Sequence, residues 1–200
     1  AAAAWYGCSG SRGTGRWVFL AGGIALGGRF LYAVETARNR PEIRHAVRPV
    51  VERTVASLMG STAVLTVGEA NLLSAGLMEW ELLKAGRRIP VYESMMFKER
   101  LAGAHSFAAG TEVSEADVGA LRAVVQERRC DAVVAVDIPP DSPLDDDDYC
   151  LFNAWKRPYV DVLRTGVPWL VLQGKIESTA ANVTVCVYRV LPAAVRGEPL

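Results

Sequence analysis

The stretch DIPPDSPLDDDD, residues 137–148, places six aspartates within twelve residues. Carboxylate oxygens are the ligands that Mg²⁺ and Ca²⁺ prefer in proteins. The spacing of these aspartates does not match a calcium-binding EF-hand loop, and the stretch has no glycine at which such a loop could turn. Consecutive aspartates repel one another and are typical of a solvated loop. We therefore predict no metal site, and we take Asp145, Asp146, Asp147 and Asp148 as candidates for contact with a basic partner subunit.

Two further carboxylates are expected where predicted strands end. Glu69 directly follows the apolar run 62–68, and Asp137 ends the run 131–137. In open α/β sheets, ligands bind outside the carboxyl ends of the strands. Glu69 and Asp137 are therefore candidates for lining a cleft in an enzyme or a small-ligand-binding domain.

No motif in the sequence names a reaction. The turn GEANLLSAG, residues 68–76, is neither a dinucleotide-binding G-x-G-x-x-G turn nor a P-loop. The glycine-rich stretch 7–16 lacks the P-loop lysine and follows no predicted strand. His45 and His105 have no metal-ligand or nucleophile motif around them. We predict no catalytic residue and no cofactor, which favours a protein that is not an enzyme.

The four cysteines are widely spaced, with no C-x-x-C pair. A zinc site requires closer ligand spacing. We predict reduced, partly buried thiols at Cys8, Cys130, Cys150 and Cys186.

Apolar runs and helical periodicity alternate through residues 61–200, which we predict to form one α/β domain. Strands alternating with helices indicate a mixed, mostly parallel sheet. The last two strands are separated by a polar turn and are expected to pair antiparallel. The predicted strands are 62–68, 88–94, 131–137, 167–177 and 182–191, and the predicted helices are 70–86 and 114–129.

Residues 35–60 are predicted to form an amphipathic neck helix in front of this domain. Pro41 suits a first helical turn, whereas Pro49 is expected to kink or interrupt the helix. Apolar residues recur at helical spacing, with arginines on the other face. Arg44 and Arg48 are candidates for contact with anionic lipid headgroups or acidic partner subunits, and a solvated helix face explains them equally well.

The run WVFLAGGIALGGRFLYAV, residues 17–34, is apolar or glycine except at Arg29. Eighteen helical residues span about 27 Å, close to the hydrocarbon thickness of a bilayer. We predict a single transmembrane helix, with Arg29 near one end and Gly23 and Gly27 facing a neighbouring helix. The alternatives are a signal-peptide hydrophobic region and a buried helix of a soluble domain. Residues 1–16 are predicted to be a flexible segment.

The net charge of zero hides an asymmetry along the chain. Residues 1–60 carry eight arginines against three glutamates, whereas the other 140 residues carry fourteen basic and nineteen acidic side chains. An acidic body disfavours binding to nucleic acid, because phosphate contacts require a basic surface. The chain begins with four alanines in place of methionine, which suggests removal of an organellar transit peptide.

Together these features predict a membrane-anchored accessory subunit of a multi-subunit membrane complex. Its partners would be the other subunits and the lipid bilayer, and its location an organellar inner membrane, as in the electron-transport complexes of mitochondria or plastids. This assignment rests on the organisation of the chain, because no motif supports it. The alternatives are an anchored α/β enzyme or ligand-binding domain with a carboxylate-lined cleft, and a soluble α/β binding protein whose core includes residues 17–34.

Replacing Gly23 and Gly27 with leucine tests the predicted spanning helix. The two glycines lie four residues apart on one side of a helix, so leucines there would hold a neighbouring helix away. We expect the double variant to stay in the membrane pellet on carbonate extraction while its association with partners is lost. A buried soluble helix would instead lose roughly 1–3 kcal/mol per leucine through overpacking. Wild-type protein in the supernatant would contradict the spanning helix.

Overall fold

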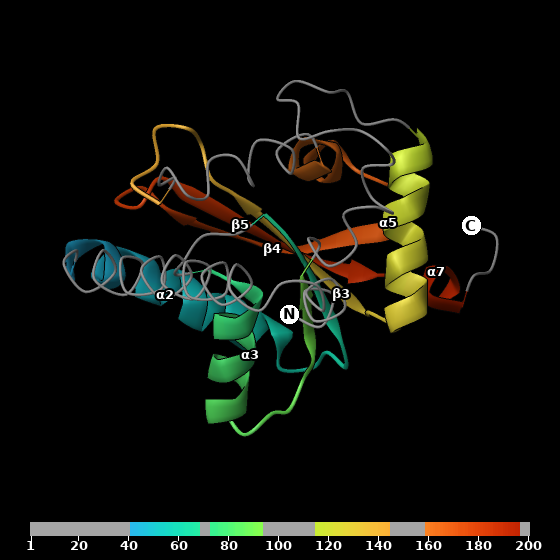
Figure 1. The fold of residues 1–200 in the computed structure, drawn as a ribbon, viewed down its shortest axis with the longest axis horizontal. Helices are drawn as coiled ribbons and strands as arrows, with labels where there is room; N and C mark the ends of the chain where they lie inside the picture. Colours follow the sequence, from blue (N-terminus) through green and yellow to red (C-terminus); the bar gives the residue numbers. More distant parts are fainter. Residues whose placement is uncertain (1–40, 69–72, 94–114, 145–158, 197–200) are drawn as a thin grey trace, which may run out of the picture. The chain divides into compact units, whose positions relative to one another are not determined.

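The computed structural model describes residues 41–68, 73–93, 115–144 and 159–196 (Figure 1). Each predicted strand overlaps an observed strand, and the two predicted helices of the body contain α3 and α5. Residues 159–165 are also helical. The elements are α2 (Pro41–Leu58), β1 (Val64–Val67), α3 (Ala75–Lys84), β2 (Val91–Glu93), α5 (Glu115–Arg128), β3 (Ala132–Asp137), β4 (Leu170–Ser178), β5 (Val183–Val190) and α7 (Pro192–Arg196).

The strands form a five-stranded mixed sheet in the order β2-β1-β3-β5-β4, which confirms the predicted α/β class. β1 pairs in parallel with both β2 and β3. β5 runs antiparallel to both β3 and β4, so the last two predicted strands do form an antiparallel pair. A register irregularity between Leu172 and Gly174 interrupts the β4–β5 ladder. The sheet thus joins a parallel half to an antiparallel half, so the prediction of a mixed sheet holds, but the prediction that it is mostly parallel is wrong.

The two central strands of the parallel half are buried on both faces. Side chains of a strand alternate between the faces of the sheet. In β3, Val134 and Val136 belong to one core cluster, whereas Val133 and Ala135 belong to the other. This explains why the sequence shows a continuous apolar run here, because alternation with polar residues occurs only where one face meets water.

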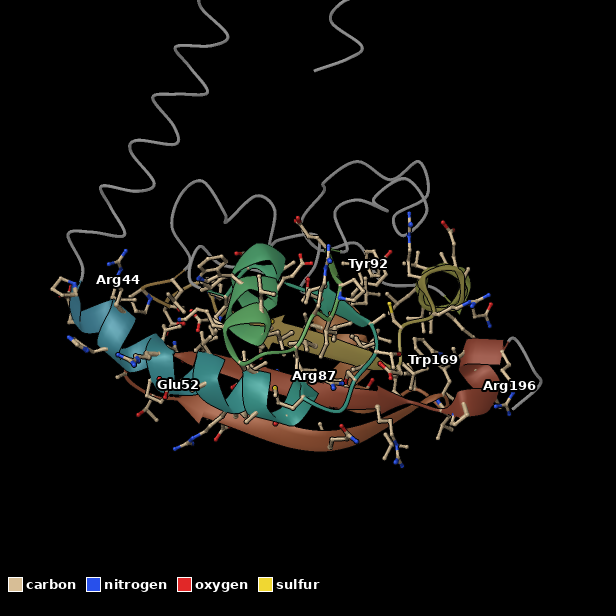
Figure 2. The ribbon with its side chains drawn as sticks, turned by 90° about the horizontal axis from the view of Figure 1, so that it is seen from below. Arg44, Glu52, Arg87, Tyr92, Trp169 and Arg196 are labelled. Carbon is tan, nitrogen blue, oxygen red and sulfur yellow. The ribbon has the colours of Figure 1, made fainter. Side chains whose placement is uncertain are left out.

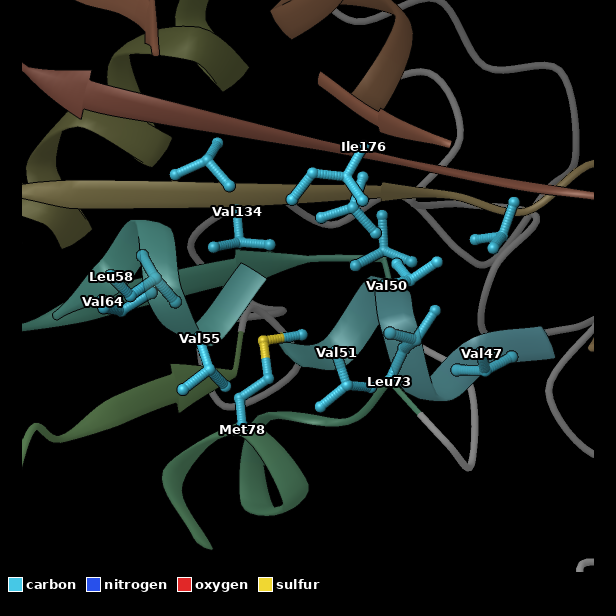
Figure 3. Close-up of a cluster of buried hydrophobic side chains, with 14 of the residues drawn as sticks. Val47, Val50, Val51, Val55, Leu58, Val64, Leu73, Met78, Val134 and Ile176 are labelled. Atoms are coloured by element: carbon cyan, nitrogen blue, oxygen red, sulfur yellow. The ribbon is translucent and has the colours of Figure 1, made fainter. Parts of the chain in front are cut away.

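Helices α2 and α3 supply side chains to the first core cluster. From α2 the cluster takes Val47, Val50, Val51, Val55 and Leu58. In Figure 3, Val50 points toward the strands, whereas Val51 and Val55 point toward Met78 of α3. The amphipathic pattern of this helix was therefore predicted correctly, but its role as a separate neck differs from the structure. Residues 42–200 cluster as one compact unit, and α2 is a layer of that unit, because its apolar stripe needs the sheet to exclude water. Pro49 lies on the exposed side of α2 and does not interrupt the helix.

The other face of the sheet is covered by α5, the helical residues 159–165 and α7. From α5, the second cluster takes Leu121, Val124 and Val125, all at most 1% exposed. The Gln126 side-chain amide donates a hydrogen bond of 2.9 Å to the Ala194 carbonyl, which joins α5 to α7. The sheet is therefore sandwiched between two helical layers.

A single carboxylate joins the starts of β1 and β3. Asp131 accepts hydrogen bonds from the backbone N–H groups of Thr62 and Ala63 at 2.9–3.2 Å and from the Thr62 hydroxyl at 2.9 Å. Its own carbonyl accepts a bond of 2.9 Å from the Val190 N–H, at the end of β5. Asp131 is thus hydrogen-bonded to the segment before β1 and to the end of β5, the two strands that flank β3.

In the part of the chain that the structure describes, no helix is long and apolar enough to cross a membrane. The predicted spanning segment 17–34 lies outside the described residues.

Replacing Asp131 with alanine removes the acceptor for two backbone N–H groups and a hydroxyl. We expect a loss of about 1–3 kcal/mol, measured as a lower melting temperature of the purified chain by circular dichroism. Asp131→Asn keeps one carbonyl oxygen as an acceptor and is expected to lose less. Asp141→Ala, on an exposed loop, serves as the control. An Asp131→Ala variant as stable as this control would contradict the role of the carboxylate.

Candidate functional site

The order of the strands identifies one point in the sheet where a ligand site is expected. After β1 the chain continues through α3 to β2, on one side of β1, whereas after β3 it continues toward β4 at the opposite edge. Connections that leave two neighbouring parallel strands in opposite directions leave a crevice outside their carboxyl ends. The ends of the two strands, at Gly68 and Asp137, lie side by side, as the register of Val67 with Ala135 requires.

Gly68 makes the end of β1 unusually close to β3. Its φ angle of +81° lies in the left-handed region that favours glycine. A Cβ atom placed on Gly68 would overlap the carbonyl oxygen of Val136. The close approach of these two backbones thus depends on glycine at this position.

Asp137 does not present a free carboxylate at this crevice. Its Oδ2 lies 2.6 Å from Nη1 of Arg164, which comes from the helical residues 159–165. The same Arg164 nitrogen lies 3.9 Å from a carboxylate oxygen of Asp161. A guanidinium between two carboxylates neutralises much of the negative charge at this end of β3. The pair joins the helical residues 159–165 to the end of β3.

Sequence patterns could have located Arg164, although the prediction missed it. Val160 and Leu163 lie at helical spacing and are both buried in the second core cluster. Gly166, with a φ angle of +102°, follows the last helical residue, as glycine commonly does at a helix end. These two signals indicate the short helix, but its salt bridge to Asp137 spans 27 residues of sequence.

Two buried groups that could act as nucleophiles, Cys130 and Tyr188, are not activated. Cys130 and Cys186 are free and buried, as predicted for these two cysteines. Burial, reinforced by the nearby Asp131 carboxylate, raises the pKa of the Cys130 thiol to about 12. Burial also raises the pKa of Tyr188, with Cys186 adding to the effect. At neutral pH both groups are protonated, and neither is a nucleophile. Cys8 and Cys150 lie outside the described residues.

Arg44 and Arg48 are both on the exposed side of α2, whose surface carries the labelled Arg44 and Glu52 in Figure 2. The Nε of Arg48 donates to Oε1 of Glu52 at 2.8 Å, and this hydrogen bond raises the pKa of Arg48. One of the two predicted cations is therefore paired within its own helix. The other predicted residues lie outside the described part of the chain: Gly23, Gly27, Arg29, Glu69, Asp145, Asp146, Asp147 and Asp148.

In the described part of the chain, four large apolar side chains are exposed, on α3 and β4. None of the four was predicted as an interaction residue. Val171 and Leu172, on the edge strand β4, are 40% and 53% exposed. Trp80 and Leu83, on α3, are 58% and 51% exposed. Exposed apolar groups that cluster on one element mark surfaces for contact with other molecules.

Among the residues described, no group of three or more His, Cys, Asp or Glu side chains is arranged to hold a metal ion. Comparison with family models, curated proteins and solved structures finds no match to this chain.

Two glycine variants test the close approach at the end of β1. Gly68→Ala forces a Cβ into the left-handed region and against a backbone carbonyl, so we expect a loss of at least about 2 kcal/mol, or roughly 4–8 °C in melting temperature. Gly119→Ala is the matched control, because Gly119 lies in α5 with nothing within 4 Å of the added Cβ. There alanine should gain about 0.5–1 kcal/mol. Equal melting temperatures for the two variants would contradict the packing described for Gly68.

Proposed function

We propose that this chain is a membrane-anchored accessory subunit, of an organellar inner-membrane complex, that acts by packing against partner proteins. The apolar run 17–34 would provide the anchor, and the α/β domain would provide the contacts. The observation that carries the proposal is the exposed apolar start of the edge strand β4.

The first residues of β4 have the features of a strand-edge contact. β4 is the last strand of the sheet, and adjacent residues of a strand point to opposite faces. Val171 lies opposite Arg189 and Leu172 opposite Tyr188, so the two exposed apolar side chains project from the two faces of the edge. A partner that adds a strand or a loop here would cover both.

The rest of β4 limits how far such a contact extends. The register irregularity follows Leu172, and beyond it Lys175 and Glu177 form an exposed salt bridge of 2.5 Å. Bulges and charges on an edge strand oppose indiscriminate pairing. The partner contact is therefore confined to the start of the strand.

The alternative of a carboxylate-lined cleft has less support. Asp137 is held by Arg164, and the buried thiol and phenol groups are protonated at neutral pH. The alternative of a soluble protein with residues 17–34 in its core also has less support, because described helices supply buried side chains to both faces of the sheet. This coverage favours assigning the apolar run to the bilayer.

Mild detergent extraction of the full-length chain from its own membranes tests the proposal. We expect the wild type to co-purify with a stoichiometric set of membrane subunits and to migrate with them on a native gel. Leu172→Lys places a charge at the strand edge and should release the chain from that assembly. Ala123→Lys, on the exposed side of α5, is the matched control and should leave the assembly intact. A wild type without partners, or a Leu172→Lys variant that keeps all of them, would overturn the proposal.

A further inference from the structure

We propose that the exposed surface of α3 and of the turn after it lies on an anionic lipid bilayer. This α3 patch consists of Trp80, Leu83, Lys84, Arg87 and Arg88. The inference goes beyond packing against partner proteins, and it rests on the membrane anchoring in the proposed function.

The apolar part of the patch follows from the orientation of α3. Successive residues of an α-helix are 100° apart, so Trp80 and Leu83 share one side with Lys84 at its margin. Met78 and Leu82 lie on the opposite side, are fully buried, and join the core cluster that also contains α2. Because that side is held in the core, Trp80 and Leu83 must face outward, where they remain more than half exposed.

Two exposed arginines follow directly after the end of α3. Gly86 has a φ angle of +80°, and its N–H donates to the Leu83 carbonyl at 3.0 Å. The next N–H, that of Arg87, donates to the Leu82 carbonyl at 2.9 Å. This pair of bonds is a Schellman motif, which folds the chain back against the last helical turn. Arg87, labelled in Figure 2, and Arg88 are exposed directly after this turn.

The charges around the patch favour an anionic occupant. Lys84 is engaged by Glu81 at 2.8 Å, and Glu79 lies on the other margin of the exposed side. The two arginines therefore supply the cationic character at the end of the patch. Guanidinium groups bind phosphate oxygens through paired hydrogen bonds.

A bilayer fits this combination better than an acidic protein does. Tryptophan prefers the level of the lipid headgroups, with leucine beneath it and basic groups at the phosphates, as in interfacial helices. The chain also supplies proximity, because the apolar run 17–34 ends seven residues before Pro41, where α2 begins. Seven residues span at most about 25 Å. A spanning helix would thus hold α2, and the α3 that shares its core cluster, at high local concentration beside the bilayer.

A fluorescent probe on α3 tests the inference in the full-length chain. The probe is an uncharged NBD group on Leu83→Cys, which keeps an apolar group at that position, with Cys8 and Cys150 replaced by serine. The protein is reconstituted into nanodiscs of phosphatidylcholine alone, or mixed with phosphatidylserine, containing nitroxide lipids as shallow quenchers. We expect a blue shift and strong quenching in the anionic discs, and neither for the same probe on Ala123→Cys of α5.

Charge variants test which side chains make the lipid contact depend on phosphatidylserine. Arg87→Glu combined with Arg88→Glu should abolish the dependence on phosphatidylserine, whereas Glu79→Gln should strengthen it. Equal quenching at positions 83 and 123 would overturn the inference, as would shielding of the Leu83→Cys probe by co-purified protein instead of lipid. If carbonate washes the chain from the discs, the anchoring of the proposed function fails. The lipid contact of the α3 patch is then tested separately, by adding the labelled chain to phosphatidylserine vesicles. Absence of a blue shift with these vesicles would overturn the inference.

Discussion

Burial of the central strands on both faces is the constraint on which the rest of the fold depends. In β3, the side chains from Val133 to Val136 are at most 2% exposed, and neighbours along the strand point to opposite faces. Apolar groups on both faces are removed from water only when helices cover both. One layer is accordingly built by α2 and α3, and the other by α5, the helical residues 159–165 and α7. The connections that carry these helices also leave β1 and β3 in opposite directions, at Gly68 and Asp137.

Among the described residues, two surfaces carry exposed apolar groups that the core and its polar contacts do not explain. At the end of β3, Arg164 forms an ion pair with Asp137, and at its start Asp131 accepts hydrogen bonds from Thr62 and Ala63. Exposed apolar groups remain at the start of β4 and on the outer side of α3. A domain with a protein contact at one of these surfaces and a lipid contact at the other would be oriented as well as anchored. That combination is what a packing subunit at a membrane requires.

The local parts of the fold could be predicted because their causes are local. A continuous apolar run such as 131–137 indicates a strand buried on both faces, and two runs joined by a short polar turn indicate an antiparallel pair. Both expectations hold for β3 and for the β4–β5 pair. That Gly68 and Asp137 lie side by side depends on β1 and β3 being neighbours in the sheet, which no local pattern specifies. The salt bridge to Arg164 did not follow, because the position of the short helix depends on packing between distant segments.

Local sequence patterns were enough to predict the type and approximate limits of most elements, and to show the apolar run 17–34 and the lack of a recognisable catalytic motif. Hydrophobic periods of two and of 3.6 residues arise from backbone geometry, so they can be read without knowing the fold. Which surface each apolar stripe covers depends on how the elements pack, and this is known from the structure alone. In α3, for example, Met78 and Leu82 are buried, whereas the equally apolar Trp80 and Leu83 are exposed. Likewise, α2 became a layer of the core in place of a neck, because burial is a property of contacts between segments far apart in the chain.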